Sequence, residues 1–290
     1  MFRGSETKGV RPFFIVRPYA TNLASYLWRC VRSGRYIPSI TKKFFVNLYH
    51  STILGFWWVV IRALLPTLGM IAILQHVPSL RPASLPYGLF VISGMVPWTG
   101  FINGLSRGTR ALKQGRAIHS RLALPKLIFV ISSGGVAAFF SAVFAVLLLI
   151  IVLYYYLSEG VNYIAFDWRL LAAPLAIVLS FLFAFGLASF TSVIFLFARD
   201  ARLVLAVTTQ FWFYFTPIIY GLEVLPESWR LAILYLNPMA SIVELFRWSL
   251  FGVGDWTALS LTFSISISLA AFALGAWFLM RSEWVIQEVM

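Results

Sequence analysis

The charged residues most suited to a functional role lie in one stretch, residues 215–252. This stretch combines acids, arginines and three prolines: Glu223, Glu227, Arg230, Glu244, Arg247, Pro217, Pro226 and Pro238. It is too polar to cross a membrane and too apolar for an ordinary loop. Glu244 and Arg247 stand three positions apart, so on a helix they can form an ordinary ion pair that stabilises the helix.

The same stretch predicts an unusual backbone. We expect a pair of short amphipathic helices at 222–250, broken at Pro226 and at Asn237–Pro238, that dip into the outer half of a bilayer and return. Irregular backbone at that depth is tolerated only where protein or a water-filled cavity covers it. A protein-lined path is therefore expected nearby.

A second set of residues suits the lining of such a path. Arg62 follows Trp58 by one helical turn inside an apolar run, where a charge is costly unless it faces a cavity or a partner, or snorkels to the inner surface. Gln210 shares a face with Tyr214 in the same way. We expect these four side chains to line a conduit, although each aromatic taken alone is more often an interface residue. Aromatic walls suit carbohydrate, because a sugar packs on a π surface without fixed hydrogen bonds, as bases do on stacking platforms.

Several chemistries are excluded. The sequence holds no G-x-x-x-x-G-K-[ST] phosphate loop, so it cannot hydrolyse a nucleotide by that route. No carboxylate pair lies in an apolar run, which counts against a proton-coupled carrier. The single cysteine, Cys30, cannot form an intrachain disulfide, and His50, His76 and His119 fall in three segments, so no metal site is expected. We therefore predict that the chain is not an enzyme and that a partner supplies its energy.

Composition indicates which elements position these residues. Hydrophobic residues make up 60% of the chain and charged residues 11%, against about 25% charged in a soluble domain. We predict an all-α polytopic membrane protein with six spans of about 20 apolar residues, at 53–75, 86–106, 127–156, 169–197, 203–221 and 257–280. The chain then divides into an N-terminal segment (1–52), a transmembrane domain (53–281) and a tail (282–290).

Charge orients the chain. Residues 1–52 hold nine Lys/Arg against one acid, and residues 107–126 hold six against none, whereas residues 221–256 hold four acids against two arginines. Lys/Arg-rich loops stay inside, so both termini are expected in the cytoplasm. The net charge of +13 is then a property of the inner face, and no nucleic-acid partner is expected.

Residues 35–52 predict an amphipathic helix in the inner membrane interface. Ile40, Phe44, Phe45 and Leu48 share one side of the helical projection. Arg35, Lys42 and Lys43 either form a platform where a phosphate-bearing lipid head group enters, or simply anchor the helix to anionic lipid.

Several short phrases, in this order, resemble the membrane (permease) subunit of ABC-type polysaccharide exporters, the family that exports O-antigen, capsule and teichoic acid. The phrases are the approach to the first span (Tyr49, Ser51, Leu54, Gly55 and Trp58), Arg199-Asp200, the PIIY run 217–220, Asn237-Pro238, Glu244 with Arg247, and the ending FLMRSEWVIQEVM. The ending is closest to the O-antigen type, although Trp284 and Met290 depart from it. Arg62 also departs from the family's neutral aromatic entrance.

The resemblance implies a half-transporter, in which the helices at 222–250 guard the exit. Glu244 and Arg247 then form either an outer gate or only the ordinary ion pair of their helix. Two copies form a channel in a bacterial inner membrane, and two copies of a separate ATPase, which holds ATP and Mg²⁺, bind the cytoplasmic face. The family places its coupling element between spans two and three. We therefore favour residues 107–126 as a coupling loop over a merely solvated positive loop, with these residues docking on the ATPase: Ala117, Ile118, His119, Ser120, Arg121 and Leu122. The expected substrate is a glycan on a lipid-pyrophosphate carrier; the alternative is a same-fold permease that exports a small lipid or drug.

Overall fold

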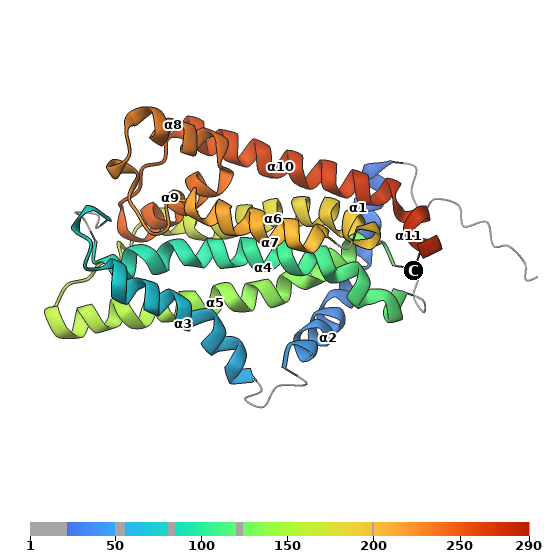
Figure 1. The fold of residues 1–290 in the computed structure, drawn as a ribbon, viewed down its shortest axis with the longest axis horizontal. Coiled ribbons are helices and arrows are strands. Elements are labelled where there is room, and N and C mark those ends of the chain that lie inside the picture. Colours follow the sequence, from blue (N-terminus) through green and yellow to red (C-terminus); the bar gives the residue numbers. More distant parts are fainter. Residues whose placement is uncertain (1–21, 50–55, 81–84, 120–123, 199, 290) are drawn as a thin grey trace, which may run out of the picture.

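Four long apolar helices form the body of the molecule (Figure 1). The computed structural model describes residues 22–49, 56–80, 85–119, 124–198 and 200–289, and every regular element in those ranges is helical. The four are α4 (Tyr87–His119), α5 (Leu127–Glu159), α6 (Ala172–Phe197) and α10 (Ala258–Arg281). Each is long and apolar enough to cross a membrane, so the protein is a multi-pass membrane protein.

Small residues let these helices approach closely. α4 packs between α5 and α6, and α6 in turn packs against α10. At the α6–α10 crossing Gly275 faces Gly186, and a Cβ added to Gly275 would overlap the Gly186 carbonyl. Contacts between small residues are typical of helix packing in a membrane, because an apolar side chain gains little free energy when it exchanges lipid neighbours for protein neighbours.

Two shorter helices, α3 (Phe56–Leu74) and α7 (Ala201–Tyr214), lie where the other two spans were expected. The prediction of a continuous span at 203–221 is wrong in its extent. α7 ends at Tyr214 because Thr216 precedes Pro217, and a residue before proline avoids the helical conformation. Its 14 residues reach about 21 Å at 1.5 Å per residue, less than a hydrocarbon core of about 30 Å.

The stretch after α7 folds as two short helices, α8 (Glu227–Leu236) and α9 (Pro238–Phe251), after the 3₁₀ turn η4 (Leu222–Val224). The predicted breaks are confirmed: α8 starts directly after Pro226, and the side chain of Asn237 caps α9, with Pro238 in its first turn. Gly252, with φ 72°, ends α9. α9 is buried on nearly every side, so it has no amphipathic outer face of the kind the sequence predicted.

The first and last described helices lie at one end of the bundle, called here the α1/α11 end (Figure 1). It holds α1 (Leu23–Arg32), the turn η1 (Gly34–Tyr36) and α11 (Glu283–Val289), and α2 (Ile37–Tyr49) leads away from it along α5. The opposite end, called the α8/α9 end, holds η4, α8 and the turns η2 (Pro78–Leu80) and η3 (Trp168–Leu171).

Most of the coupling loop predicted at 107–126 is a continuation of α4 in the structure. α4 continues without a break to His119, because no proline interrupts the chain between Pro97 and Pro125. The basic residues from Arg107 to Arg116 therefore belong to a membrane-crossing helix and its extension.

Candidate functional site

A groove of about 350 Å³ lies between α3 and α7, with α4 behind it. Its lining includes Thr67 and Met70 of α3, Trp98 of α4, and Gln210 and Tyr214 of α7. The lining is mostly apolar and aromatic, with a few hydrogen-bonding side chains. That mixture suits an amphipathic substrate with apolar faces and scattered hydroxyl groups.

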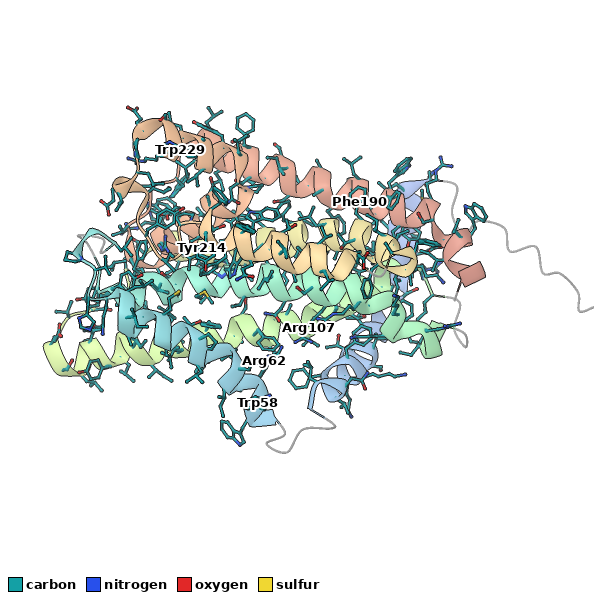
Figure 2. The ribbon with its side chains drawn as sticks, viewed as in Figure 1. Trp58, Arg62, Arg107, Phe190, Tyr214 and Trp229 are labelled. Carbon is teal, nitrogen blue, oxygen red and sulfur yellow. The ribbon has the colours of Figure 1, made fainter. Side chains whose placement is uncertain are left out.

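Two of the four predicted lining residues share this groove. Gln210 and Tyr214 lie one turn apart on the face of α7 that borders it, whereas Trp58 and Arg62 are exposed on α3 nearer the start of that helix (Figure 2). Arg62 is one turn before Pro66, which does line the groove. The structure thus places α3 and α7 on the border of one groove, and the lining of a conduit by all four residues stays a prediction.

An aromatic cluster supports the groove from behind. Trp98 contacts Phe213 with ring centroids 5.6 Å apart, and Phe101 stacks on Phe183 at 5.4 Å. Trp212 meets the edges of both Phe101 and Phe183. Interlocked rings of this kind hold α4, α6 and α7 in fixed positions, so the groove wall is preformed.

The other side of α7 borders a second groove, of about 430 Å³, against α8. Phe211, Phe215 and Trp229 line it and are 62%, 54% and 60% exposed. Trp229 was not among the predicted lining residues. A tryptophan in a short helix that follows a proline is a signal that could have pointed to it. α7 therefore presents aromatic side chains on both flanks, an apolar surface that lipid or another protein chain must cover.

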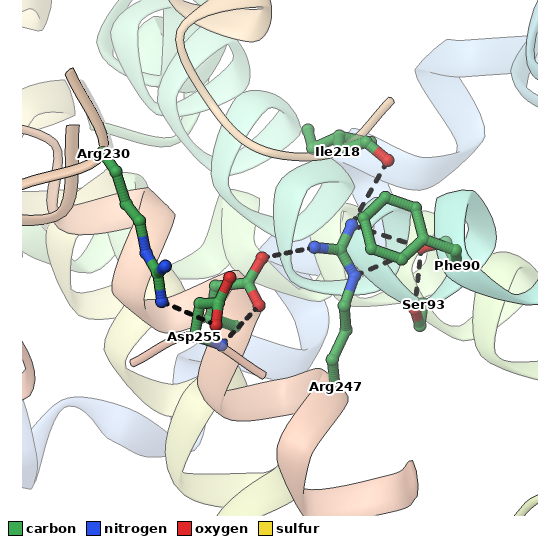
Figure 3. Close-up of polar contacts among 7 residues, drawn as sticks. Phe90, Ser93, Ile218, Arg230, Arg247 and Asp255 are labelled. Atoms are coloured by element: carbon green, nitrogen blue, oxygen red, sulfur yellow. Dashed lines mark hydrogen bonds and ion pairs between the residues drawn. The ribbon is translucent and has the colours of Figure 1, made fainter. Parts of the chain in front are cut away.

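The predicted gate residues are buried in an ion-pair network (Figure 3). Arg247 is 1% exposed and Glu244 4%, and the Arg247 Nη1 donates to Glu244 Oε1 at 2.5 Å. The same guanidinium donates to the carbonyls of Phe90 and Ile218 and lies 3.6 Å from the centroid of the Phe90 ring. α9 is thereby fastened to α4 and to the turn after α7.

The network continues towards the surface of the α8/α9 end. The second oxygen of Glu244 accepts the backbone N–H of Asp255 at 3.0 Å. The Asp255 carboxylate in turn pairs with Arg230 of α8 at 2.9 Å (Figure 3). The contacts show an internal fastening, and a gating role for Glu244 and Arg247 stays a prediction.

Asn237 fixes the junction between α8 and α9. Its Oδ1 accepts from the Trp212 indole at 2.9 Å and from the Met239 N–H at 3.1 Å. Its Nδ2 donates to the Phe215 carbonyl and to the Thr216 hydroxyl, both at 3.0 Å. One buried side chain thus orders the break after α7 and the start of α9.

The predicted head-group residues lie on η1 and α2. Ile40 and Phe44 are buried against the body, while Lys42 and Lys43 are exposed, as the amphipathic pattern predicts. Arg35 is exposed and donates to the Tyr36 hydroxyl at 3.0 Å. These positive charges are free to meet an anionic surface.

The predicted coupling residues divide between the end of α4 and a part of the chain that lies outside the described residues. Ala117, Ile118 and His119 form the last turn of α4, and Ile118 is partly buried. Ser120, Arg121 and Leu122 lie outside the described residues. Their role as an ATPase contact stays a prediction.

A buried carboxylate joins three segments at the α1/α11 end. Glu283 Oε1 accepts from the Tyr26 hydroxyl and from the Lys126 N–H, both at 2.8 Å. The Leu127 N–H donates to the Tyr26 hydroxyl at 3.2 Å, so the pair caps α5 from outside the helix. Burial raises the pKa of Glu283 and lowers that of Lys126 to about 8. The sequence did not predict this contact, because it joins three segments that lie far apart along the chain.

No site for a metal ion is found within the ranges that the structure describes: no three His, Cys, Asp or Glu side chains gather there. Cys30 is buried against the body as a free thiol, and burial raises its pKa to about 12.

Comparison with known proteins bears on these features. The sequence profile of a family described as ABC-2 type transporter matches residues 36–251. An O-antigen export system permease protein RfbA from Klebsiella pneumoniae is 24% identical over 208 residues, which are 72% of this chain and 77% of that protein. A protein of the same name from Myxococcus xanthus is 23% identical over 201 residues, 69% of this chain and 74% of the relative.

Proposed function

The chain belongs to the ABC-2 type transporter family, and we propose that it is the membrane subunit of an ATP-driven exporter for a lipid-linked, O-antigen-like polysaccharide. The direction is from the cytoplasm to the outer face of a bacterial inner membrane. Similarity to O-antigen export permeases over about 70% of the chain supports the substrate class. The chain's role is transport, and the catalysis of ATP hydrolysis falls to another subunit.

The observation that carries the proposal is the exposed aromatic surface of α7. Phe211, Tyr214 and Phe215 are each more than half exposed, next to the amide of Gln210. Side chains of this kind let a polymer of sugars slide, because they offer stacking faces without a fixed hydrogen-bond pattern. A pore for an inorganic ion would instead present carbonyl or charged rings.

Two copies of the chain complete the path in this proposal. α3 and α7 leave aromatic and apolar side chains uncovered within one copy, including Trp57 and Trp58 at 68% and 45% exposed. A second copy that covers these helices would enclose a conduit lined by Trp58, Arg62, Gln210 and Tyr214. Glu244 and Arg247 would hold its outer end in shape.

The partner ATPase is assigned to the α1/α11 end, where the last turn of α4 lies. ATP and Mg²⁺ would bind that partner, since this sequence lacks a phosphate loop. The exposed Lys42 and Lys43 of α2, with Arg35, would draw the anionic head group of the substrate to the inner surface.

The test is deletion of the gene in its native host, followed by measurement of lipid-linked glycan on each side of the inner membrane. We expect glycan to accumulate inside and to disappear from the cell surface. An unchanged surface glycan would overturn polysaccharide export and favour a permease for a small lipid or drug.

Substitutions test the conduit separately. Trp58→Ala and Tyr214→Ala, or Glu at either position, should cut export while the protein still assembles with its ATPase. Phe190→Ala is a matched control, since that ring stacks on Phe278 between α6 and α10 and lines neither of the two grooves beside α7. Full export by both conduit variants would contradict the proposed lining.

A further inference from the structure

A long stretch of the chain, residues 7–158, has no acidic residue of its own to neutralise its arginines. Residues 7–158 contain no aspartate and no glutamate, yet they build α2, α3, α4 and α5. Three ion pairs between described residues use acids beyond that range: Asp167 with Arg169, Asp255 with Arg230, and Glu244 with Arg247.

Two arginines of this stretch lie together inside the region spanned by the apolar helices. Arg62 of α3 and Arg107 of α4 are neighbours in Figure 2, on the side where α2 and α3 diverge from the bundle. The charges that act on Arg107 are both positive, those of Arg62 and Arg110. The structure therefore concentrates like charges where a single arginine would already be costly.

Arg107 is incompletely satisfied. Its guanidinium lies 5.0 Å from the centroid of the Phe140 ring of α5, a favourable contact for a cation. Its Nε, however, is buried and has no hydrogen-bond partner. An arginine cannot escape this situation by losing its proton, and a buried charge without a partner is retained at a cost in stability.

The chemistry of the missing partner follows from these facts. It must be an anion, since only an anion offsets two guanidinium groups at once. Residues 7–158 cannot supply it, since they hold no aspartate or glutamate. Phosphate oxygens fit best, because they accept two parallel hydrogen bonds from the guanidinium fork.

The surroundings favour a phosphate that carries a hydrocarbon chain over a free phosphate ion. Phe140 is followed by a line of rings: Phe139 lies 5.7 Å from Phe140, and Phe45 of α2 meets Phe139 edge-on at 5.0 Å. These rings form an apolar wall that runs from α5 to the interface helix α2. A lipid places its head group on the arginines and its chain along such a wall.

We propose that Arg62 and Arg107 form a binding site for the diphosphate head group of a polyprenyl lipid carrier, beside the apolar wall of Phe45, Phe139 and Phe140. The choice of a diphosphate rests on the proposed function and on charge matching. A sugar-linked diphosphate carries two negative charges, one for each arginine, whereas an ordinary phosphodiester lipid carries one. Lys42 and Lys43 would gather the lipid at the surface, and the arginine pair would hold it.

Binding is measured on the full-length chain in lipid nanodiscs, with undecaprenyl pyrophosphate and phosphatidylglycerol as the two probes. The variants are Arg62→Gln, Arg107→Gln and the double variant. Arg32→Gln is the control, since it removes an exposed arginine of α1. Arg107→Lys keeps the charge and removes the fork.

Each Gln variant should weaken binding of the diphosphate lipid about tenfold, the size of one lost charge-assisted hydrogen bond, and the control should not. Arg107→Lys should fall between Arg107→Gln and the unmodified chain. Arginine-dependent binding that is equally strong for phosphatidylglycerol would overturn the diphosphate assignment. Unchanged binding in the double variant would overturn the site.

Complementation of the deletion strain separates this site from the proposed function. If the unmodified gene restores surface glycan and the double variant does not, although it reaches the membrane, both proposals are supported. If the double variant restores export fully, the arginine site is wrong and export stands. If deletion never altered surface glycan, the proposed function itself is wrong, and the binding data decide the arginine site alone.

Discussion

Two arginines of this protein lie against a phenylalanine ring inside the bundle, and their surroundings differ. Arg247 stacks on Phe90 at 3.6 Å and also holds Glu244 and two backbone carbonyls. Arg107 lies over Phe140 at 5.0 Å, with its Nε buried and unpartnered and a second arginine beside it. The first site is complete within the chain, whereas the second lacks an anion.

The difference teaches how to separate structural from functional charges in a membrane protein. A buried arginine whose fork is satisfied by its own chain contributes to the fold, and removing it leaves its partner uncompensated. An arginine that the chain leaves incomplete contributes little to the fold, so a ligand is the better reason for its presence. Substitutions should therefore affect the two sites in opposite ways.

The largest effect on stability is expected at Arg247, whose hydrogen-bond partners all come from the chain itself. Arg247→Ala should lower the free energy of unfolding by about 3–5 kcal/mol, because Glu244 would remain as a buried charge without a partner. Thermal unfolding of the purified protein in detergent measures this. The double substitution Arg247→Met with Glu244→Leu should regain much of the loss, and a double variant as unstable as Arg247→Ala would contradict the pairing argument.

A buried carboxylate extends the comparison to the α1/α11 end. Glu283→Ala should lower the free energy of unfolding by about 2–4 kcal/mol, since the Tyr26 hydroxyl and the Lys126 N–H both lose their acceptor. Glu283→Gln is the matched control, because its amide oxygen can accept both bonds. Equal loss in the two variants would show that the acceptor geometry is not what matters.

The stability of the protein should also depend on pH through Glu283. Burial raises the pKa of Glu283 above its ordinary value of 4.5, so the folded protein holds this proton more tightly than the unfolded chain does. Its contribution to stability is therefore greatest below pH 4.5 and is lost as the pH rises through the raised pKa. Glu283→Gln lacks this loss, so its stability relative to the unmodified protein should grow from pH 4.5 upwards. A difference that is constant with pH would contradict this.

The smallest effect on stability is expected at the incomplete site. Arg107→Gln should leave the free energy of unfolding unchanged within about 1 kcal/mol, or raise it, because the substitution relieves repulsion from Arg62 and Arg110. The same thermal unfolding assay measures it, without added lipid. A loss comparable to that of Arg247→Ala would show that Arg107 is a structural residue and remove the contrast between the two sites.

Much of the architecture could be predicted from residue patterns. Runs of apolar residues gave four of the six expected spans as long helices, because each must satisfy its own backbone in lipid. The proline and asparagine at 226 and 237–238 marked the ends of α8 and α9, because these residues act locally on the backbone. The length of α7 was overestimated, since apolar character persists beyond Tyr214 while the helical backbone does not.

The sites could be predicted only in part, for a physical reason. Spacing placed Glu244 and Arg247 one turn apart and Gln210 beside Tyr214, because both relations lie within a single helix. It could not place Arg107 beside Arg62, Glu283 at the start of α5, or Trp229 across from Phe211, since each of these joins elements far apart in the sequence. The prediction for the basic residues after residue 106 was also wrong in part: they were assigned to a loop, but up to His119 they belong to the extension of a spanning helix.

The sequence by itself determined that this is a helical, multi-pass membrane protein, because hydrophobicity and helix breaking act over a few residues at a time. It also determined that the first half of the chain carries positive charge without any acid from residue 7 to residue 158. Only the tertiary structure decided which arginines find partners. Packing brings Glu244, Phe90 and Ile218 around Arg247 and leaves Arg107 near Arg62. The energy of a buried charge depends on its neighbours in space, and these are set by how the helices pack.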